Sequence, residues 1–244
     1  MKRILLAVSL FVLLLIPYIG KAGDEFCFDA PAKGGAAACT PTISEPFTYS
    51  SNGYLDTMSS NVWTALNWYT HWTVTSSQVV CSAGGWETLS AMHSTAVGSP
   101  NQYAKIKVVM LDGNTSVGVA LRFTDASTHF YSVIMNPTTL TWLHCVGSTC
   151  TSIATGSLAI ANGDTVGISL TGAGASTYLR AFNNPVANCS TSATSWDATN
   201  DYDLQLITTS GTNNVDTGNY VGLSYNQGTA NVGIVDNFYA GPLP

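Results

Sequence analysis

The stretch TWLHCVGSTCTSI, residues 141–153, contains three side chains whose types suit metal or redox chemistry. Cys145 and Cys150 are five positions apart, and His144 stands beside the first of them. A zinc site would need a fourth ligand and CxxC-like spacing, and the sequence offers neither nearby. If the flanking residues form strands, the two cysteines face each other across a hairpin at a separation that a disulfide can bridge. We therefore predict a Cys145–Cys150 disulfide.

Four more cysteines complete an even count of six, which in an exported chain predicts three disulfides. Cys27 and Cys39 enclose a short Gly/Ala-rich loop and form the second predicted pair. Cys81 and Cys189 then remain to pair over a long distance, although the sequence alone leaves this last pairing open.

The N-terminus predicts export. Lys2 and Arg3 precede an apolar run at residues 4–16, and Pro17 and small residues follow it, as in a secretory signal peptide spanning residues 1–22. The alternative is an uncleaved anchor, but thirteen residues fall short of the roughly 20 that a membrane-spanning helix needs. No later stretch is apolar and long enough to span a bilayer. We expect a secreted protein, extracellular or periplasmic.

Charge excludes some partners. Cleavage after Ala22 leaves five basic and fourteen acidic residues, a net charge of −9. Because so few cations cannot form a basic stripe, we expect neither nucleic acid nor an anionic membrane as a partner. Charged residues make up only 9% of the chain, and hydroxyl and amide side chains take their place.

No motif for catalysis is present, and no catalytic residue is proposed. A serine hydrolase would want Gly-x-Ser-x-Gly, and both GISLT (167–171) and GLSYN (222–226) fail at the last position. The four histidines are scattered without ligand spacing, and we interpret them as strand residues with satisfied hydrogen bonds.

Two segments carry side chains suited to binding. Oxygen donors that Ca²⁺ prefers gather at Asp197, Asn200, Asp201 and Asp203, although the alternative is a solvated acidic loop. No cofactor is required. Aromatic rings with polar neighbours could lie on a surface and stack on a pyranose, and they are Tyr131, Trp142, Trp196 and Tyr202. The alternative is that these rings fill the core.

The elements that would position these residues are short β-strands with turn signals every 8 to 12 residues, which indicates an all-β sandwich or barrel with little helix. One helical turn is expected within NVWTALNW, residues 61–68. The predicted strands span residues 72–83, 103–111, 116–124, 130–136, 139–146, 151–158, 164–172, 177–183, 203–209, 219–226 and 233–241.

The order of these strands resembles a known family. QYAKIKV, VGVALRF, FYSVIMN, LTWLHCV, DTVGISLTG, TYLRAFNN and the closing NYVGLSYN…VDNFYAG are similar to the laminin-G-like jelly rolls of the concanavalin A-like lectin/glucanase superfamily. The resemblance implies a two-sheet antiparallel sandwich in which the last strand, with Asp236 and Phe238, returns beside the first. The resemblance also favours the hypothesis of a bound Ca²⁺.

The resemblance implies either recognition or hydrolysis of glycans. Glycosidases of this superfamily carry Glu-x-Asp-x-x-Glu on one strand, and none of the three glutamates here begins that motif. We therefore predict a signal peptide (1–22), a disulfide-stapled arm (23–45) and a laminin-G-like sandwich (46–244) that recognises an extracellular glycan or surface protein without catalysis. The alternatives are a polysaccharide hydrolase or lyase with an unrecognised acid pair, or a structural, adhesive protein. The oligomeric state is left open.

Overall fold

The computed structural model describes residues 41–60, 62–65, 72–81, 88–111, 115–124, 129–147, 149–183, 203–208, 215, 217–227 and 233–243. The predicted signal peptide (1–22) lies outside them, as does the predicted arm up to residue 40 with Cys27 and Cys39. Among the described residues, no helix is both long enough and apolar enough to cross a membrane.

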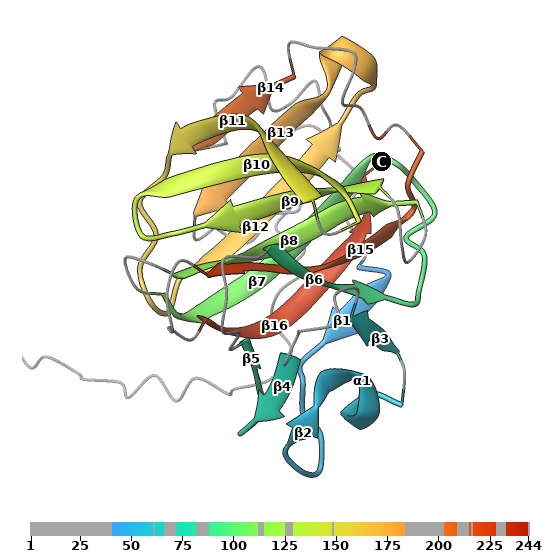
Figure 1. Cartoon of the computed structure of the whole chain (residues 1–244), viewed down its shortest axis with the longest axis vertical. Helices are drawn as coiled ribbons and strands as arrows, with labels where there is room; N and C mark the ends of the chain where they lie inside the picture. The colour runs from blue at the N-terminus through green and yellow to red at the C-terminus, as the bar shows by residue number, and fades with distance from the viewer. Residues whose placement is uncertain are drawn as a thin grey trace, which may run out of the picture.

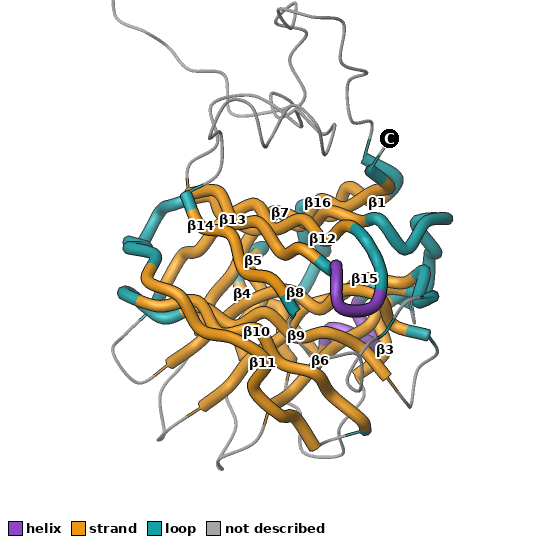
Figure 2. Tube along the Cα trace, turned by 90° about the horizontal axis from the view of Figure 1, so that it is seen from above, coloured by secondary structure: helices purple, strands orange, loops and turns teal. Residues whose placement is uncertain are grey.

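The described part of the chain folds into two antiparallel sheets that face each other as the layers of a sandwich (Figures 1 and 2). The nine-stranded sheet runs in the order β14 (Leu204–Ile207), β13 (Tyr178–Asn183), β12 (Thr165–Thr171), β7 (Gln102–Met110), β16 (Gly233–Pro242), β5 (Gln78–Cys81), β4 (Trp72–Thr75), β2 (Gly53–Tyr54), with β1 (Ile43–Glu45) also paired to β16. The seven-stranded sheet runs in the order β11 (Thr149–Ser157), β10 (Thr139–Val146), β9 (His129–Met135), β8 (Thr115–Phe123), β15 (Tyr220–Gln227), β6 (Thr88–His93), β3 (Trp63–Ala65). This is the predicted jelly-roll sandwich.

Alternation of side chains explains the two layers. In β7, Ala104, Ile106 and Val108 are fully buried in the main core, while Lys105 and Lys107 point to the opposite face. The same period of two places Leu140 and Trp142 of β10 in the core. In β7 the register is fixed by this burial, because a slip of one residue would turn its apolar side chains away from the core.

Most strand predictions agree with the structure, and β10 matches its predicted bounds. The single strand predicted at residues 72–83 is wrong, because β4 and β5 pair there as an antiparallel hairpin. The last strand does return beside the first, because β1 pairs with β16 and Glu45 lies opposite Phe238. The structure adds β1 within the last residues of the predicted arm. The predicted turn of helix at 61–68 is wrong, since Trp63–Ala65 form β3 and the helix α1 spans Leu55–Met58.

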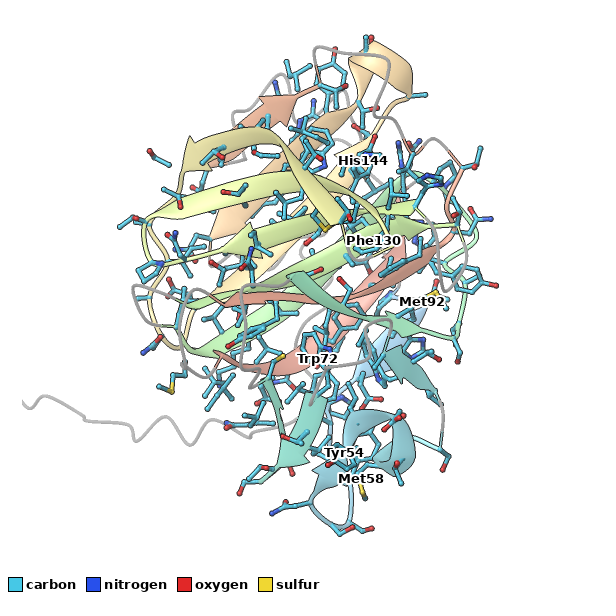
Figure 3. All side chains as sticks on the ribbon, viewed as in Figure 1. Tyr54, Met58, Trp72, Met92, Phe130 and His144 are labelled. Carbon is cyan, nitrogen blue, oxygen red and sulfur yellow. A yellow bond between two sulfur atoms is a disulfide. The ribbon has the colours of Figure 1, made fainter. Side chains whose placement is uncertain are left out.

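A second apolar cluster covers the outer face of the seven-stranded sheet. It consists of Met92, Ala120, Phe123, Phe130, Ile134, Leu143 and Cys145. Figure 3 labels Met92 and Phe130, on β6 and β9 of this sheet. Cys150 packs against the same cluster, so the hairpin disulfide also contributes to apolar packing.

Candidate functional site

Two predicted ligand-binding rings are part of the core. Tyr131 and Trp142 are both fully buried and lie 5.2 Å apart, ring centre to ring centre, in a T-shaped contact. The prediction that they lie on a surface is wrong, because strand alternation turns both toward the opposite sheet. The Tyr131 hydroxyl accepts a hydrogen bond from the backbone N–H of Val215, which satisfies its polar atom there. Trp196 and Tyr202 lie outside the described residues.

The predicted calcium loop is described only at Asp203. Its carboxylate accepts a hydrogen bond from the backbone N–H of Asn183 across the start of β14, where the side chain is exposed. Asp197, Asn200 and Asp201 lie outside the described residues. Within the ranges described, no three His, Cys, Asp or Glu side chains gather in a group that could hold a metal ion.

The cysteines of the hairpin form the predicted disulfide. Cys145 and Cys150 are directly opposite partners in the β10–β11 register, with Cα atoms 4.1 Å apart. The two sulfur atoms are bonded to each other, which excludes them as ligands of a zinc ion. Cys81 is different, because its buried thiol is free in the structure. Its predicted partner Cys189 lies outside the described residues, so the Cys81–Cys189 bond stays a prediction.

A cavity of about 60 Å³ lies where the edges of the two sheets meet α1. Its lining comes from β2, α1, β3, β4 and β6, and consists of Tyr54, Leu55, Asp56, Trp63, Ala65, Trp72 and Ala91. In Figure 1, β2, α1, β3 and β4 lie at the end of the sandwich away from β11 and β14. Figure 3 places the labelled Tyr54 beside Met58 at that end, with Trp72 nearer the centre of the molecule.

The rings of this aromatic cavity differ in exposure. Tyr54 is 54% exposed, whereas Trp63 and Trp72 are only 1% and 4% exposed. Tyr54 therefore presents an aromatic surface to solvent, and the two tryptophans form the inner wall. Gly53, next to Tyr54, carries no Cβ, and one there would lie 2.6 Å from the Met58 sulfur, so the glycine lets α1 approach β2 closely.

Two aromatic side chains pack against the Trp63 ring and hold it in place. The ring makes edge contacts with Phe238 at 5.2 Å and with His93 at 4.9 Å between ring centres. Burial lowers the pKa of His93, and its Nδ1 accepts a hydrogen bond from the Thr95 backbone N–H, so the neutral ring is the favoured form. The wall of the cavity is thus fixed before any ligand arrives.

The described residues in and around the cavity contribute few polar groups, namely two indole N–H groups, a tyrosine hydroxyl and carboxylates. The Trp72 indole N–H is buried and donates to no acceptor among the described residues. The Trp63 indole N–H is directed toward the Tyr49 hydroxyl, but the two do not form a well-aligned hydrogen bond. That hydroxyl donates to Glu45, and burial together with the Glu45 carboxylate raises the pKa of Tyr49. Among the residues that the structure describes, Asp56 is the carboxylate of the lining, and it is exposed.

The arrangement can bind a small polar group with an apolar face. Aromatic rings accept the C–H face of a sugar, and a carboxylate accepts hydrogen bonds from its hydroxyl groups. Among the described residues, one carboxyl group lines this cavity.

Sequence reasoning missed this cavity. Trp63 and Trp72 stand in short strands, where the usual interpretation of a tryptophan is a core residue. Tyr54 precedes a helix of only four residues, and Asp56 lies within it. One available signal was the pair of tryptophans nine residues apart, preceded in the sequence by Tyr54 and Asp56.

Comparison with known proteins supports the fold. No family model matches the sequence, and no curated protein matches it. A Bacillus subtilis protein of unknown function with a galectin-like fold is similar over 84% of this chain and 97% of its own, with 8% identity and a TM-score of 0.54. The fold is a concanavalin A-like sandwich.

Two further structures are similar at lower scores. The carbohydrate-binding module CBM66 from Bacillus subtilis has 12% identity and a TM-score of 0.46, and the match covers 75% of this chain and 93% of the module. The exoplasmic/lumenal domain of VIP36 in a Ca²⁺-bound form has 13% identity and a TM-score of 0.48, over 82% of this chain and 90% of that domain.

Proposed function

We propose that this protein is a secreted, extracellular or periplasmic recognition module that binds glycans without cleaving them. The observation that carries the proposal is the aromatic cavity, whose described lining brings three aromatic side chains and one carboxylate to a space at the sheet edges. The sandwich fold and the hairpin disulfide support it, because a rigid, oxidised scaffold holds such a site in place.

Binding at one such site is weak, because it covers little of the ligand. Strength would come from several copies acting on one polysaccharide or cell surface. The low charge of the chain fits this role, since hydroxyl and amide groups dominate its polar surface.

The proposal is tested with the mature chain on a glycan array, in buffer with and without a calcium chelator. Tyr54→Ala removes the exposed ring, and Val146→Ala removes an exposed apolar side chain on β10 as a matched control. We expect the wild type and Val146→Ala to bind the same glycans, and Tyr54→Ala to lose roughly three- to tenfold in affinity, as for loss of an aromatic contact of about 0.5–1.5 kcal/mol.

Three outcomes contradict the proposal: no binding to any glycan, equal binding by all three proteins, or release of shortened products. Binding that is lost with the chelator would restore the calcium hypothesis for Asp197, Asn200, Asp201 and Asp203.

A further inference from the structure

His129 and His144 are fifteen residues apart in the sequence, and the pairing of β9 with β10 brings them together. His144 lies directly opposite Tyr131, and His129 lies two residues before Tyr131, so the three side chains share one face of the sheet. The two imidazole rings are 5.9 Å apart, centre to centre, and their planes differ by 7°. The two histidines are therefore a cross-strand pair.

The histidine pair lies at the margin of the core. Tyr131 is fully buried, and its ring contacts His144 edge-on at 6.3 Å between ring centres. His144 is half-buried and His129 is exposed. Figure 3 labels His144 toward the end of the molecule that carries β14 and Tyr54 at the opposite end, so the pair is separate from the aromatic cavity.

A ligand can reach the ring nitrogens of the pair. Within the described part of the chain, no hydrogen bond involves an imidazole nitrogen of His129 or His144. The nitrogens of His144 keep accessible surface, unlike the buried indole nitrogen of Trp142. Burial and the neighbouring His129 lower the pKa of His144, so this ring is neutral near pH 7, which is the form that binds a metal.

The spacing of the two rings matches a shared metal ion. Metal–nitrogen bonds of about 2.0–2.1 Å place the centres of two imidazoles on one ion about 5–6.5 Å apart, depending on the angle at the metal. The observed 5.9 Å lies within that range. His129 is exposed, so a rotation about its side-chain bonds is enough to direct a nitrogen at the ion.

The donor atoms select the metal. Imidazole nitrogen suits Zn²⁺, Ni²⁺ and Cu²⁺, whereas Ca²⁺ and Mg²⁺ require oxygen ligands. Among the described residues, no third His, Cys, Asp or Glu side chain joins the pair, so water completes the coordination. Structural Zn²⁺ sites are closed by four protein ligands, and Cu²⁺ forms the stronger bonds to a site of this kind.

We propose that His129 and His144 together bind one divalent copper ion, each through one imidazole nitrogen, with water in the remaining positions. The ion joins β9 to β10 next to the Cys145–Cys150 disulfide, which joins β10 to β11. Copper and disulfide thus hold three consecutive strands at one end of the seven-stranded sheet. The site has no part in the glycan binding proposed above.

The test is a titration of the mature chain with CuCl₂, in which calorimetry gives affinity and stoichiometry and electron paramagnetic resonance counts the nitrogen ligands. The chain carries no polyhistidine tag and its terminal amine is acetylated, because either group would bind copper itself. His129→Gln, His144→Gln and the double variant remove the ligands, and His93→Gln is the matched control because it removes a histidine outside the pair. Circular dichroism confirms that each variant is folded, and His129→Gln is a change at an exposed position where misfolding is not a concern.

We expect one copper ion per chain, coordinated by two nitrogens. Each single variant should lose about tenfold or more in affinity, because losing a ligand costs no less than losing an outer-shell partner. The double variant should lose little more than either single variant, because one substitution already breaks the chelate. His93→Gln should match the wild type, and Zn²⁺ should bind more weakly than Cu²⁺.

Absence of copper binding, or binding that either single variant retains in full, overturns the inference. Two independent copper sites, each removed by one of the single variants, also overturn it, because the two imidazoles would then not share an ion. Tighter binding of Zn²⁺ than of Cu²⁺ overturns the choice of metal. Each of these results leaves the proposed glycan binding standing.

Discussion

Replacement of Arg122 by methionine should destabilise the sandwich more than any other single change at a charged residue described here. Arg122 is fully buried, at the end of β8. Its guanidinium donates hydrogen bonds to three backbone carbonyls, those of Pro100 at 2.6 Å, Gly172 at 2.5 Å and Val215 at 3.0 Å. These carbonyls belong to three separate loops, so one side chain ties the loops together at that end of the sheets.

The magnitude follows from what the substitution leaves behind. A hydrogen bond to a charged group contributes about 1.5–3 kcal/mol, but the three are coupled and removing the cation also removes its desolvation cost. We expect Arg122→Met to lower the free energy of unfolding by about 3–5 kcal/mol. Arg122→Lys keeps the charge but not the planar fork, so it should lose about half as much.

The assay is urea unfolding at pH 7, monitored by tryptophan fluorescence and circular dichroism. The loss of unfolding free energy expected for Arg122→Met corresponds to a fall in melting temperature of about 6–20 °C for a chain of this size. Loss of less than 1 kcal/mol in the methionine variant, or full retention in the lysine variant, would refute the idea that the carbonyl contacts hold the loops.

Three further predictions concern the cysteines and one histidine. Replacing Cys145 and Cys150 together by serine should cost about 2 kcal/mol of stability, since the closed loop is short, and an unchanged urea midpoint would argue against the staple. The Cys81 thiol is buried, and that burial raises its pKa. In the absence of reductant, iodoacetamide should therefore modify Cys81 only after the chain is unfolded. No modification of the unfolded chain would mean that Cys81 is in a disulfide. Burial lowers the pKa of His93 below 6.5, so the stability it contributes is complete above about pH 6.5 and is lost as the pH falls through the lowered pKa. Wild type should therefore lose more stability between pH 7.5 and pH 5.5 than His93→Gln does, and identical losses would contradict this.

The hairpin that carries the disulfide could be predicted from the sequence because its signals are local. Alternating apolar and polar residues, β-branched side chains and a Gly-containing turn mark β10 and β11, and the cysteines face each other once the turn is placed. At the turn, Gly147 adopts a φ of 59°, a conformation that favours glycine.

The aromatic cavity could not be predicted in this way because its residues come together only in the folded chain. Tyr54 and Ala91 are far apart in sequence and meet through the pairing of β3 with β6 and of β2 with β4. Strands of two or three residues and a helix of four show no period, so no pattern identifies them. Tyr131 and Trp142 show the converse error, since polar neighbours along a strand belong to its other face.

The most direct test of the account is equilibrium binding of the mature chain to the glycan it prefers, followed by mass spectrometry of the recovered glycan. We predict saturable binding that depends on Tyr54, with the glycan recovered at its original mass after prolonged incubation. A shortened glycan would reveal catalysis, and a glycan that binds equally well to Tyr54→Ala would place recognition away from the aromatic cavity; either result contradicts the account.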